Sequence, residues 1–350
     1  MDSIYWLYKP YEGVENGRGY SVHNNAMYNY TKKYMDLDDP YAEYHLQIVP
    51  ADSYYESIGK KNILFVAWEF PEVPESYKRG LAHADQVFVP CRFVADIFRP
   101  YTQHEPIVVP EGIEPKDYPY YQRKEPDYAK GERFRVLWAG ARNTRKGYQH
   151  MLDLIRMASS RPDMEFYIKT HANLDREKAI IELNKVGVQD VDKFFDVYLS
   201  TKEVRVLGEH KNIYFDMRSV SKSELRDIYN SAHCFLFSTH GEGWGLMGTE
   251  VLATGCPLIA PMHTALKDWF DCQVGFPITF HEKQIEATNY GNMMVTTYEP
   301  DISSIIEQVF YVKNNYQEAL RRGKTGSKRM HSKFTWDMAG QKLAKILKRL

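Results

Sequence analysis

The sequence predicts two α/β domains, each with a parallel β-sheet covered by helices. Short apolar runs rich in β-branched and aromatic residues alternate with segments of helical periodicity, which is typical of parallel α/β units. The alternation stops in a charged stretch with three prolines at residues 114–133, which we interpret as a linker, and then starts again. A chain of 350 residues is long enough for two such domains.

The first series of elements lies before the linker. We expect its strands in the five apolar runs SIYWLY, YHLQIV, NILFVAW, QVFVP and PIVVP. Helical periodicity predicts helices between them, at about residues 20–35, 76–84 and 92–99.

The second series follows the linker. Its expected strands are FRVLWAG, EFYIKT, NIYFD, HCFLFS and PLIAP. Helices are expected near residues 147–159, 223–230, 246–254 and 301–315. Ser221 and Glu224 form a possible capping box before the second of these helices. The last segment, FTWDMAGQKLAKILKRL, has apolar residues at helical spacing and predicts a C-terminal helix.

Composition and charge restrict the kind of partner. The formal net charge of −1 argues against a dedicated polyanion binder, although it leaves room for a local basic site. We interpret the basic run at residues 321–333 as a solvated connector, and lipid phosphate or DNA is the alternative ligand for it. We expect neither a signal peptide nor a membrane span, and four cysteines without metal-ligand spacing favour a reducing cytoplasm.

The stretch HGEGWGLMGTE, residues 240–250, predicts a ligand site. It lies between the strand HCFLFS and a helix, so it forms a turn at the carboxyl end of a strand. Glycines let the backbone approach a ligand, and free amides at the helix start favour an anion. Glu242 and Glu250 can accept hydrogen bonds from hydroxyl groups. Either acid alone could be a solvated side chain, but the whole arrangement describes a sugar-nucleotide site.

A second turn carries the cations that such a site needs. In WAGARNTRKGYQHMLDLI a strand ends in glycine and a helix follows, with Arg142, Arg145 and Lys146 between them. Cations at a helix N-terminus oppose the helix dipole, so a nearby anion would explain them. A diphosphate held between this turn and the Glu242 loop satisfies both features. Because successive residues of a turn point in different directions, we expect Lys146, rather than Arg145, to face the cleft.

Together the two turns resemble those of the retaining glycosyltransferases of family 4, also called glycosyl transferases group 1. The family has two glutamates in an E-x7-E motif, which stands here as Glu242-Gly243-Trp244-Gly245-Leu246 followed by Glu250. Its diphosphate turn has a glycine, an arginine and a lysine-glycine pair, which correspond here to Gly140, Arg142 and Lys146-Gly147. The turn is one residue shorter than usual, and Ala141 directly follows the glycine.

The resemblance covers most of residues 134–270 and is looser before them. It includes NIYFDMRSV, which adds Met217 and Arg218 to the implied donor-binding set. The loop GVENGRGYS, with Gly17 and Gly19, matches the first loop of the family. WEFPEVPESY resembles the loop that faces the donor sugar, where many members have a histidine; Trp68-Glu69 stands here instead, and Glu69 joins the implied set.

The resemblance implies the GT-B fold, with two Rossmann-like doubly wound domains facing a cleft. Residues 1–125 would form the acceptor side and residues 126–333 the donor side, and the helix in residues 334–350 would return to the N-terminal domain with Trp336 as an anchor. The implied reaction moves a hexose or pentose from a nucleotide diphosphate donor, such as a UDP- or GDP-sugar, to an acceptor hydroxyl. Arg142 and Lys146 would stabilise the leaving diphosphate, Glu242 would orient the sugar and Glu250 would bind the ribose.

Several alternatives remain open at this point. An epimerase or hydrolase could act on the nucleotide sugar alone, and a non-catalytic protein could bind it. The acceptor could be a glycan, a lipid, another small molecule or a modified nucleic-acid base. We expect no cofactor and no metal, because neither site turn has a DxD triplet or a cluster of His and Asp residues.

Overall fold

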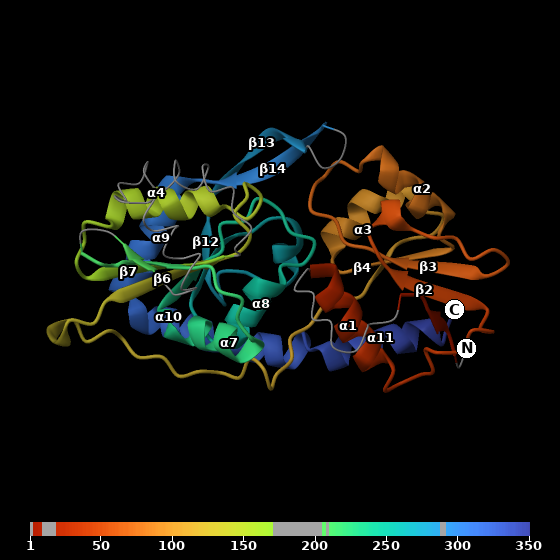
Figure 1. Cartoon of the computed structure of the whole chain (residues 1–350), viewed down its shortest axis with the longest axis horizontal. Coiled ribbons are helices and arrows are strands. Elements are labelled where there is room, and N and C mark those ends of the chain that lie inside the picture. Colours follow the sequence, from red (N-terminus) through yellow and green to blue (C-terminus); the bar gives the residue numbers. More distant parts are fainter. Residues whose placement is uncertain (1–2, 9–18, 171–204, 208–209, 288–291) are drawn as a thin grey trace.

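The structure, a computed structural model, describes residues 3–8, 19–170, 205–207, 210–287 and 292–350. Two parallel sheets lie in two halves of the molecule, and both termini lie at the same end (Figure 1). The sheet of the N-terminal half has the order β1-β2-β3-β4-β5, and all its pairs are parallel. Its elements are β1 (Tyr5–Trp6), α1 (Gly19–Thr31), β2 (Tyr44–Ile48), β3 (Lys61–Phe65), α2 (Glu75–His83), β4 (Gln86–Val89), α3 (Arg92–Phe98) and β5 (Ile107–Val108).

The sheet of the C-terminal half is doubly wound. Its order is β12-β11-β10-β6-β7-β9-β8, and only β8 runs antiparallel to its neighbour within the described residues. The elements are β6 (Phe134–Ala139), α4 (Tyr148–Ala158), β7 (Met164–Lys169), β8 (Arg205–Leu207), β9 (Ile213–Asp216), α7 (Lys222–Ser231), β10 (Cys234–Leu236), α8 (Leu246–Ala253), β11 (Leu258–Pro261) and β12 (Phe276–Ile278). The strand order grows in both directions from β6, so the β6–β10 boundary is a topological switch point.

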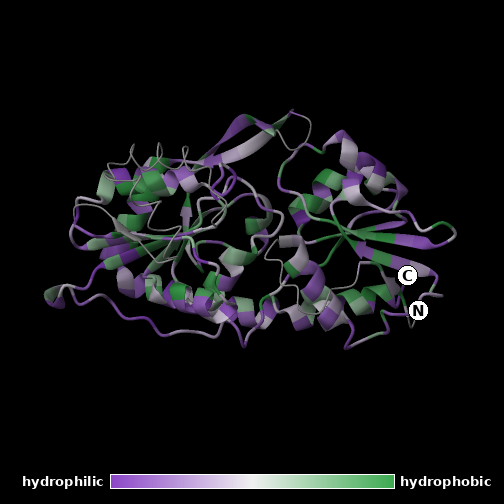
Figure 2. Ribbon diagram, in the orientation of Figure 1, coloured by the Kyte–Doolittle hydropathy of each residue, from purple (hydrophilic) through white to green (hydrophobic). Residues whose placement is uncertain are grey.

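The side chains of β6 explain how the helices cover this sheet. Val136 and Trp138 belong to the hydrophobic cluster on the side of α4, whereas Leu137 and Ala139 belong to the cluster on the side of α8. Alternate strand residues point to opposite faces, so a strand covered on both faces reads as a continuous apolar run. Figure 2 shows hydrophobic residues concentrated along the strands of both sheets. The capping box of Ser221 and Glu224 is present at the start of α7, as predicted.

Three helices complete the chain: α9 (Ile302–Asn314), α10 (Tyr316–Lys333) and α11 (Trp336–Leu347). The interpretation of residues 321–333 as a connector is wrong, because they lie in α10. The sequence did not reveal this helix, because small residues stand at buried positions where large apolar residues would give a helical pattern. Gly326 is one of them: a Cβ atom there would lie 2.2 Å from the side chain of Leu252, so its absence lets α10 pack closely on α8.

The C-terminal helix returns to the N-terminal half, as predicted. α11 packs on α1, and Gly340 approaches the backbone of Tyr30 so closely that a Cβ would be 2.6 Å from it. Trp336 is buried there with Leu343 and Leu347 and acts as an anchor. The predicted domain boundaries at residues 125 and 333 are not tested by these contacts and stay a prediction.

Several further features were not predicted, among them the outer strands β8 and β12 of the C-terminal sheet. The strands β13 (Phe280–Ala287) and β14 (Met293–Pro300) form an antiparallel pair that lies above the two halves in Figure 1. This pair contacts the N-terminal half, because the Thr296 amide donates to the Glu72 carboxylate at 2.8 Å. In the linker, the buried Arg123 donates to the carbonyl oxygens of Ala232 and Thr254 and so ties the linker to the C-terminal half. No helix in the described part of the chain could span a membrane.

Candidate active site

The two turns singled out from the sequence meet at the topological switch point. The first, residues 140–147, follows β6, and the second, residues 237–245, follows β10, the strand beside β6. Parallel neighbours end at the same edge of the sheet, so both turns reach the place where doubly wound folds bind ligands. Direct hydrogen bonds join the turns: the His240 amide donates to the Arg145 carbonyl at 2.7 Å, and the Ser238 hydroxyl donates to the Gly147 carbonyl at 2.9 Å.

Gly147 is required for this approach. Its φ of +69° lies in the left-handed region, and a Cβ atom there would be 1.7 Å from the carbonyl oxygen of Ser238. α4 begins at the next residue. A larger residue would push the two turns apart and move the cations away from the Glu242 loop.

Glu242 is buried at the meeting point of the turns. Its Oε1 accepts from the Lys146 ammonium at 2.6 Å and from the Thr239 hydroxyl at 2.9 Å. Its Oε2 faces the Arg145 guanidinium at 3.3 Å. Burial alone would raise the pKa of Glu242, but the cations Lys146 and Arg145 outweigh it and lower the pKa below its ordinary value. The carboxylate is therefore charged.

Arg145 corrects one expectation from the sequence. We expected only Lys146 to face the cleft, but both side chains reach Glu242. The Arg145 guanidinium also donates to the Gly241 carbonyl at 3.1 Å and lies 3.3 Å from the Glu69 carboxylate of the N-terminal half. Gly147, which has no Cβ, lets the two turns pack closely, and both cations then lie within reach of the carboxylate. Arg145 thus joins loops from both halves.

Arg142, the other predicted cation of the first turn, has a different position. Its guanidinium carbon lies 5.1 Å from the centre of the Tyr148 ring, at the start of α4, and the side chain is partly buried. Gly140, the first residue of the turn, donates its amide to the Lys169 carbonyl at 3.0 Å.

Glu250 lies on the second turn of α8 in a different environment. Its Oε2 accepts from the Tyr229 hydroxyl at 3.3 Å, and the Tyr118 hydroxyl also bonds to it. Burial raises the pKa of Glu250 to about 7, and the two tyrosine hydroxyls offset this only in part. Near neutral pH this acid therefore exists in both protonation states.

The glycine loop around Glu242, residues 241–245, packs against the N-terminal half. A Cβ at Gly241 would lie 2.5 Å from the Glu69 carbonyl oxygen, and the Cys91 thiol donates to the Gly243 carbonyl at 3.2 Å. The Trp244 ring is buried 5.6 Å from the Phe334 ring. Of the next two predicted donor-binding residues, Gly245 is the N-cap of α8 and Leu246 is its first residue.

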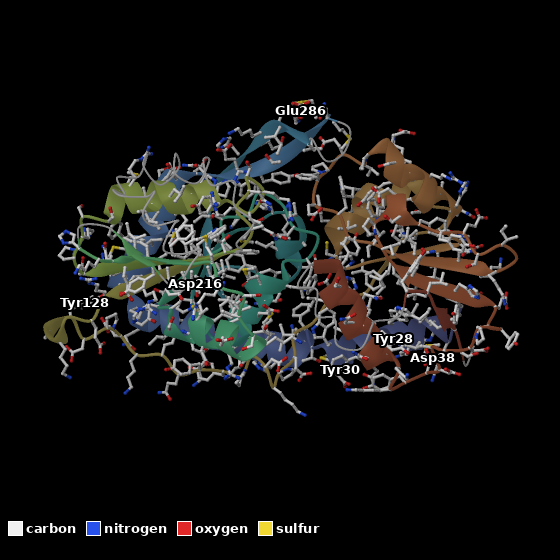
Figure 3. The ribbon with its side chains drawn as sticks, viewed as in Figure 1. Tyr28, Tyr30, Asp38, Tyr128, Asp216 and Glu286 are labelled. Atoms are coloured by element: carbon white, nitrogen blue, oxygen red, sulfur yellow. The ribbon has the colours of Figure 1, made fainter. Side chains whose placement is uncertain are left out.

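The remaining predicted residues are more dispersed. Met217 is buried in the core of the C-terminal half, and Arg218 holds both carboxylate oxygens of Asp216 at 3.0 and 2.8 Å. Figure 3 labels Asp216 in the interior of this half. Gly19 is the first residue of α1, and Gly17 lies outside the described residues.

Sequence reasoning missed the groups that support the Glu242 loop. Thr239 bonds to the carboxylate, and the Thr264 hydroxyl accepts from the Glu242 amide at 3.1 Å. Behind them the Nε2 atoms of His150 and His240 lie 3.0 Å apart, and burial lowers the pKa of His240 to about 3. Single polar residues at strand ends carry no periodic signal that would reveal them. Among the described residues no three His, Cys, Asp or Glu side chains gather as metal ligands.

Comparisons with solved structures support the fold. Sucrose-phosphate synthase from Thermosynechococcus elongatus matches with a TM-score of 0.61 at 13% identity, over 96% of this chain and 80% of that one. Anabaena Alr3699/HepE, solved with UDP and glucose, matches with a TM-score of 0.61 at 10% identity, over 88% and 78%. The pneumococcal O-GlcNAc transferase GtfA, solved with UDP and GlcNAc, matches with a TM-score of 0.55 at 15% identity, over 87% of this chain but 56% of that one.

No curated protein sequence matches the chain. A family model does match: "Family 4 Glycosyltransferase in conflict systems" covers residues 93–343, well over half of the chain. This range includes both site turns and the strands that carry them, and the fold around them is the GT-B fold. The chain therefore belongs to the family 4 glycosyltransferases found in conflict systems, and it is a retaining glycosyltransferase.

Proposed function

We propose that the protein transfers a sugar from a nucleoside diphosphate sugar to an acceptor hydroxyl at the β6–β10 switch point. The observation that supports this proposal is the contact of one buried carboxylate, Glu242, with two cations, Lys146 and Arg145. A diphosphate needs the cations, and the hydroxyl groups of a sugar need the acid. Because HepE and GtfA were solved with UDP, a UDP-sugar is the first donor to test, and a GDP-sugar is the second.

In this proposal the leaving group is stabilised by the first turn. The bond from the anomeric carbon to the phosphate oxygen breaks, and negative charge grows on the diphosphate. Lys146 and Arg145 lie where they can neutralise it, and the amides at the start of α4 add to the field. Each charge-assisted hydrogen bond contributes about 1.5–3 kcal/mol.

The sugar and the acceptor would be handled by the second turn and by the diphosphate itself. Glu242, charged and fixed by Thr239, would accept hydrogen bonds from the sugar hydroxyls. The acceptor oxygen bonds to the anomeric carbon on the face that the phosphate leaves, and its proton passes to the departing phosphate oxygen. Glu250 would bind the ribose hydroxyls, for which its place on α8 beside Tyr229 is suited.

The proposal can be tested with a panel of nucleotide sugars. A bound donor raises the melting temperature by mass action, so a thermal-shift screen identifies the sugar and the base. Release of nucleoside diphosphate is then measured with and without candidate acceptors. Transfer to an acceptor supports the proposal. Rapid donor turnover without any acceptor would favour a hydrolase or epimerase instead, and failure of every nucleotide sugar to stabilise the protein would count against the donor class.

A further inference from the structure

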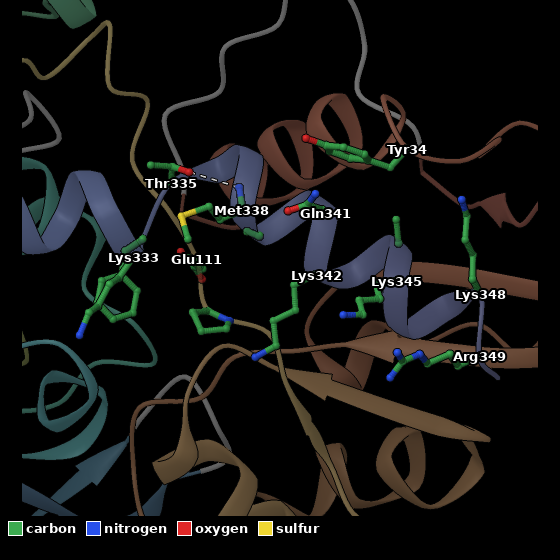
Figure 4. A pocket seen from close by; sticks show the side chains of 14 residues that line it. Tyr34, Glu111, Lys333, Thr335, Met338, Gln341, Lys342, Lys345, Lys348 and Arg349 are labelled. Atoms are coloured by element: carbon green, nitrogen blue, oxygen red, sulfur yellow. Dashed lines mark hydrogen bonds between the residues drawn. The ribbon is translucent and has the colours of Figure 1, made fainter.

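A groove on the N-terminal half lies outside the site described above. It is a cavity of about 770 Å³ along α11. Figure 4 shows lysine and arginine side chains following the helix from one end of this groove to the other. The residues that matter for its chemistry are Tyr34, Glu111, Lys333, Lys342, Lys345, Lys348 and Arg349.

The groove is strongly cationic. Its lining has five cations and one carboxylate, Glu111, which faces the ring nitrogen of His23 at 3.0 Å. Lys333, Lys342, Lys345 and Arg349 form no ion pair with any residue that the structure describes. Burial against neighbouring atoms lowers the pKa of Lys342, although the residue as a whole is exposed. Four of the five cations, Lys333, Lys342, Lys345 and Arg349, therefore line the groove without an acidic partner among the described residues.

Three of the cations form a row. Lys342, Lys345 and Lys348 are three residues apart along α11 and its end, so they follow one side of the helix over about 9 Å. Like charges at this spacing destabilise a helix by a few tenths of a kcal/mol per pair. The helix dipole favours Lys345 in the last turn of α11 and Lys333 in the last turn of α10, but it does not explain Lys342 or why these cations line one hollow.

The shape of the groove favours a chain-like ligand. A membrane surface would need a broad apolar face on α11 to insert, but Trp336, Leu343 and Leu347 are buried in the cluster that packs on α1. Met338, at 42% exposed, is the one large hydrophobic side chain of this fully described helix that is exposed. A strand of nucleic acid instead presents a line of phosphates and stacks its bases on aromatic rings. The partly exposed ring of Tyr34 lines the groove, and its hydroxyl is held by Asp337 at 2.8 Å. We propose that this groove binds the phosphate backbone of a single-stranded nucleic acid.

The groove also adjoins the glycosyltransferase site. Phe334 lines the groove, and its ring packs on the ring of Trp244. Trp244 follows Glu242 by two residues in the glycine loop. The end of the groove at Phe334 therefore adjoins the glycine loop. The binding does not depend on the proposed donor chemistry, so it is measured without a donor.

The experiment uses fluorescence anisotropy with a labelled oligothymidine of about twelve nucleotides and the full chain. The wild type should bind with an affinity that falls with salt, by about 0.7 log units in affinity per log unit of salt for each phosphate contact. Lys342→Glu/Lys345→Glu should reduce this slope by about 1.4 and weaken binding about 50-fold near 50 mM salt. The matched control is Lys324→Glu/Lys328→Glu, which reverses two exposed lysines of α10 outside the groove.

The outcomes separate this proposal from its rivals. The control should bind like the wild type, and both variants should keep the wild-type melting temperature and the wild-type affinity for nucleoside diphosphate. Equal losses in both double variants would overturn the proposal, because they would indicate a general charge effect. Absence of oligonucleotide binding, or sedimentation with phosphatidylserine vesicles in its place, would also overturn it. If the wild type does not bind nucleoside diphosphate at all, that result would instead contradict the proposed donor site.

Discussion

Glu242 and Glu250 are the same side chain eight residues apart, but the structure places them in opposite environments. Glu242 lies between Lys146 and Arg145, which lower its pKa and keep it charged. Glu250 is half-buried beside two tyrosine hydroxyls, and its removal from solvent raises its pKa to about 7. The difference shows that an acid's role is set by the groups that its neighbouring turns bring to it. We therefore expect the two acids to respond differently to every perturbation.

The largest expected effect follows from removing the charged acid. Glu242→Ala should lower kcat/KM by roughly 100- to 10,000-fold, because it removes about two charge-assisted hydrogen bonds to the sugar. Steady-state kinetics with the donor identified by the thermal-shift screen measure this. Glu242→Gln, which keeps one acceptor oxygen, should recover part of the activity. Near-wild-type turnover in Glu242→Ala would remove this residue from the sugar site.

The protonation of Glu250 should appear in the pH dependence of stability. Its pKa of about 7 in the folded protein exceeds the ordinary value of 4.5, so the folded state holds the proton between these values. The free energy of unfolding should therefore fall as pH rises from about 4.5 through 7, by up to roughly 3 kcal/mol from this group.

Denaturant titrations of the wild type and Glu250→Gln from pH 4.5 to 8 test this expectation. The variant lacks the titrating proton, so its stability relative to the wild type should increase over this range. A difference that does not change with pH would show that Glu250 has an ordinary pKa.

The two cations beside Glu242, Lys146 and Arg145, should contribute to catalytic efficiency to similar extents. Lys146→Ala and Arg145→Ala should each reduce kcat/KM by about 10- to 150-fold, since each loses a charge-assisted contact of about 1.5–3 kcal/mol. A double-mutant cycle with Glu242→Gln would measure their coupling. If Arg145→Ala kept full activity while Lys146→Ala did not, the expectation from the sequence that only Lys146 faces the cleft would be correct.

A smaller effect is expected at Glu69. Its ion pair with Arg145 joins side chains that are each about one quarter exposed, at 27% and 25%, so solvent screens it. Glu69→Gln should therefore change kcat/KM by about fivefold or less. A loss as large as that of Glu242→Ala would mean that Glu69 contacts the donor itself.

The smallest expected effect is that of metal removal. The proposed diphosphate site uses Lys146, Arg145 and backbone amides, so activity should survive treatment with a chelator. Complete loss that returns with magnesium or manganese would contradict this prediction.

Local signals predicted much of the fold. The strands of the N-terminal sheet and the central strands of the C-terminal sheet were visible because their apolar runs are bounded by Gly, Pro and polar residues, and the capping box at Ser221 marked α7. The short outer strands β8 and β12 of the C-terminal sheet were not predicted. α10 was missed because Gly323 and Gly326 stand where large apolar residues would reveal a packed face. β13 was missed because most of its residues are exposed, so it lacks an apolar pattern.

The candidate site was predictable to the level of its loops. The glycines and acids of residues 240–250 mark a turn, and the cations of residues 142–146 mark another. The direction of each side chain was not predictable. Gly147 packs closely on Ser238, and both Arg145 and Lys146 reach Glu242 across the two turns. Such a contact between distant loops depends on packing that no local pattern encodes.

The central claim is that Glu242 serves the sugar and Glu250 the nucleotide. It is tested most directly by isothermal titration calorimetry of free nucleoside diphosphate with the wild type, Glu242→Ala and Glu250→Ala. We predict that Glu250→Ala weakens binding about tenfold or more, through lost hydrogen bonds to the ribose. Glu242→Ala should leave the affinity unchanged or increase it, because its loss frees Lys146 and Arg145 for the diphosphate. Weakened binding in Glu242→Ala together with wild-type binding in Glu250→Ala would contradict the account.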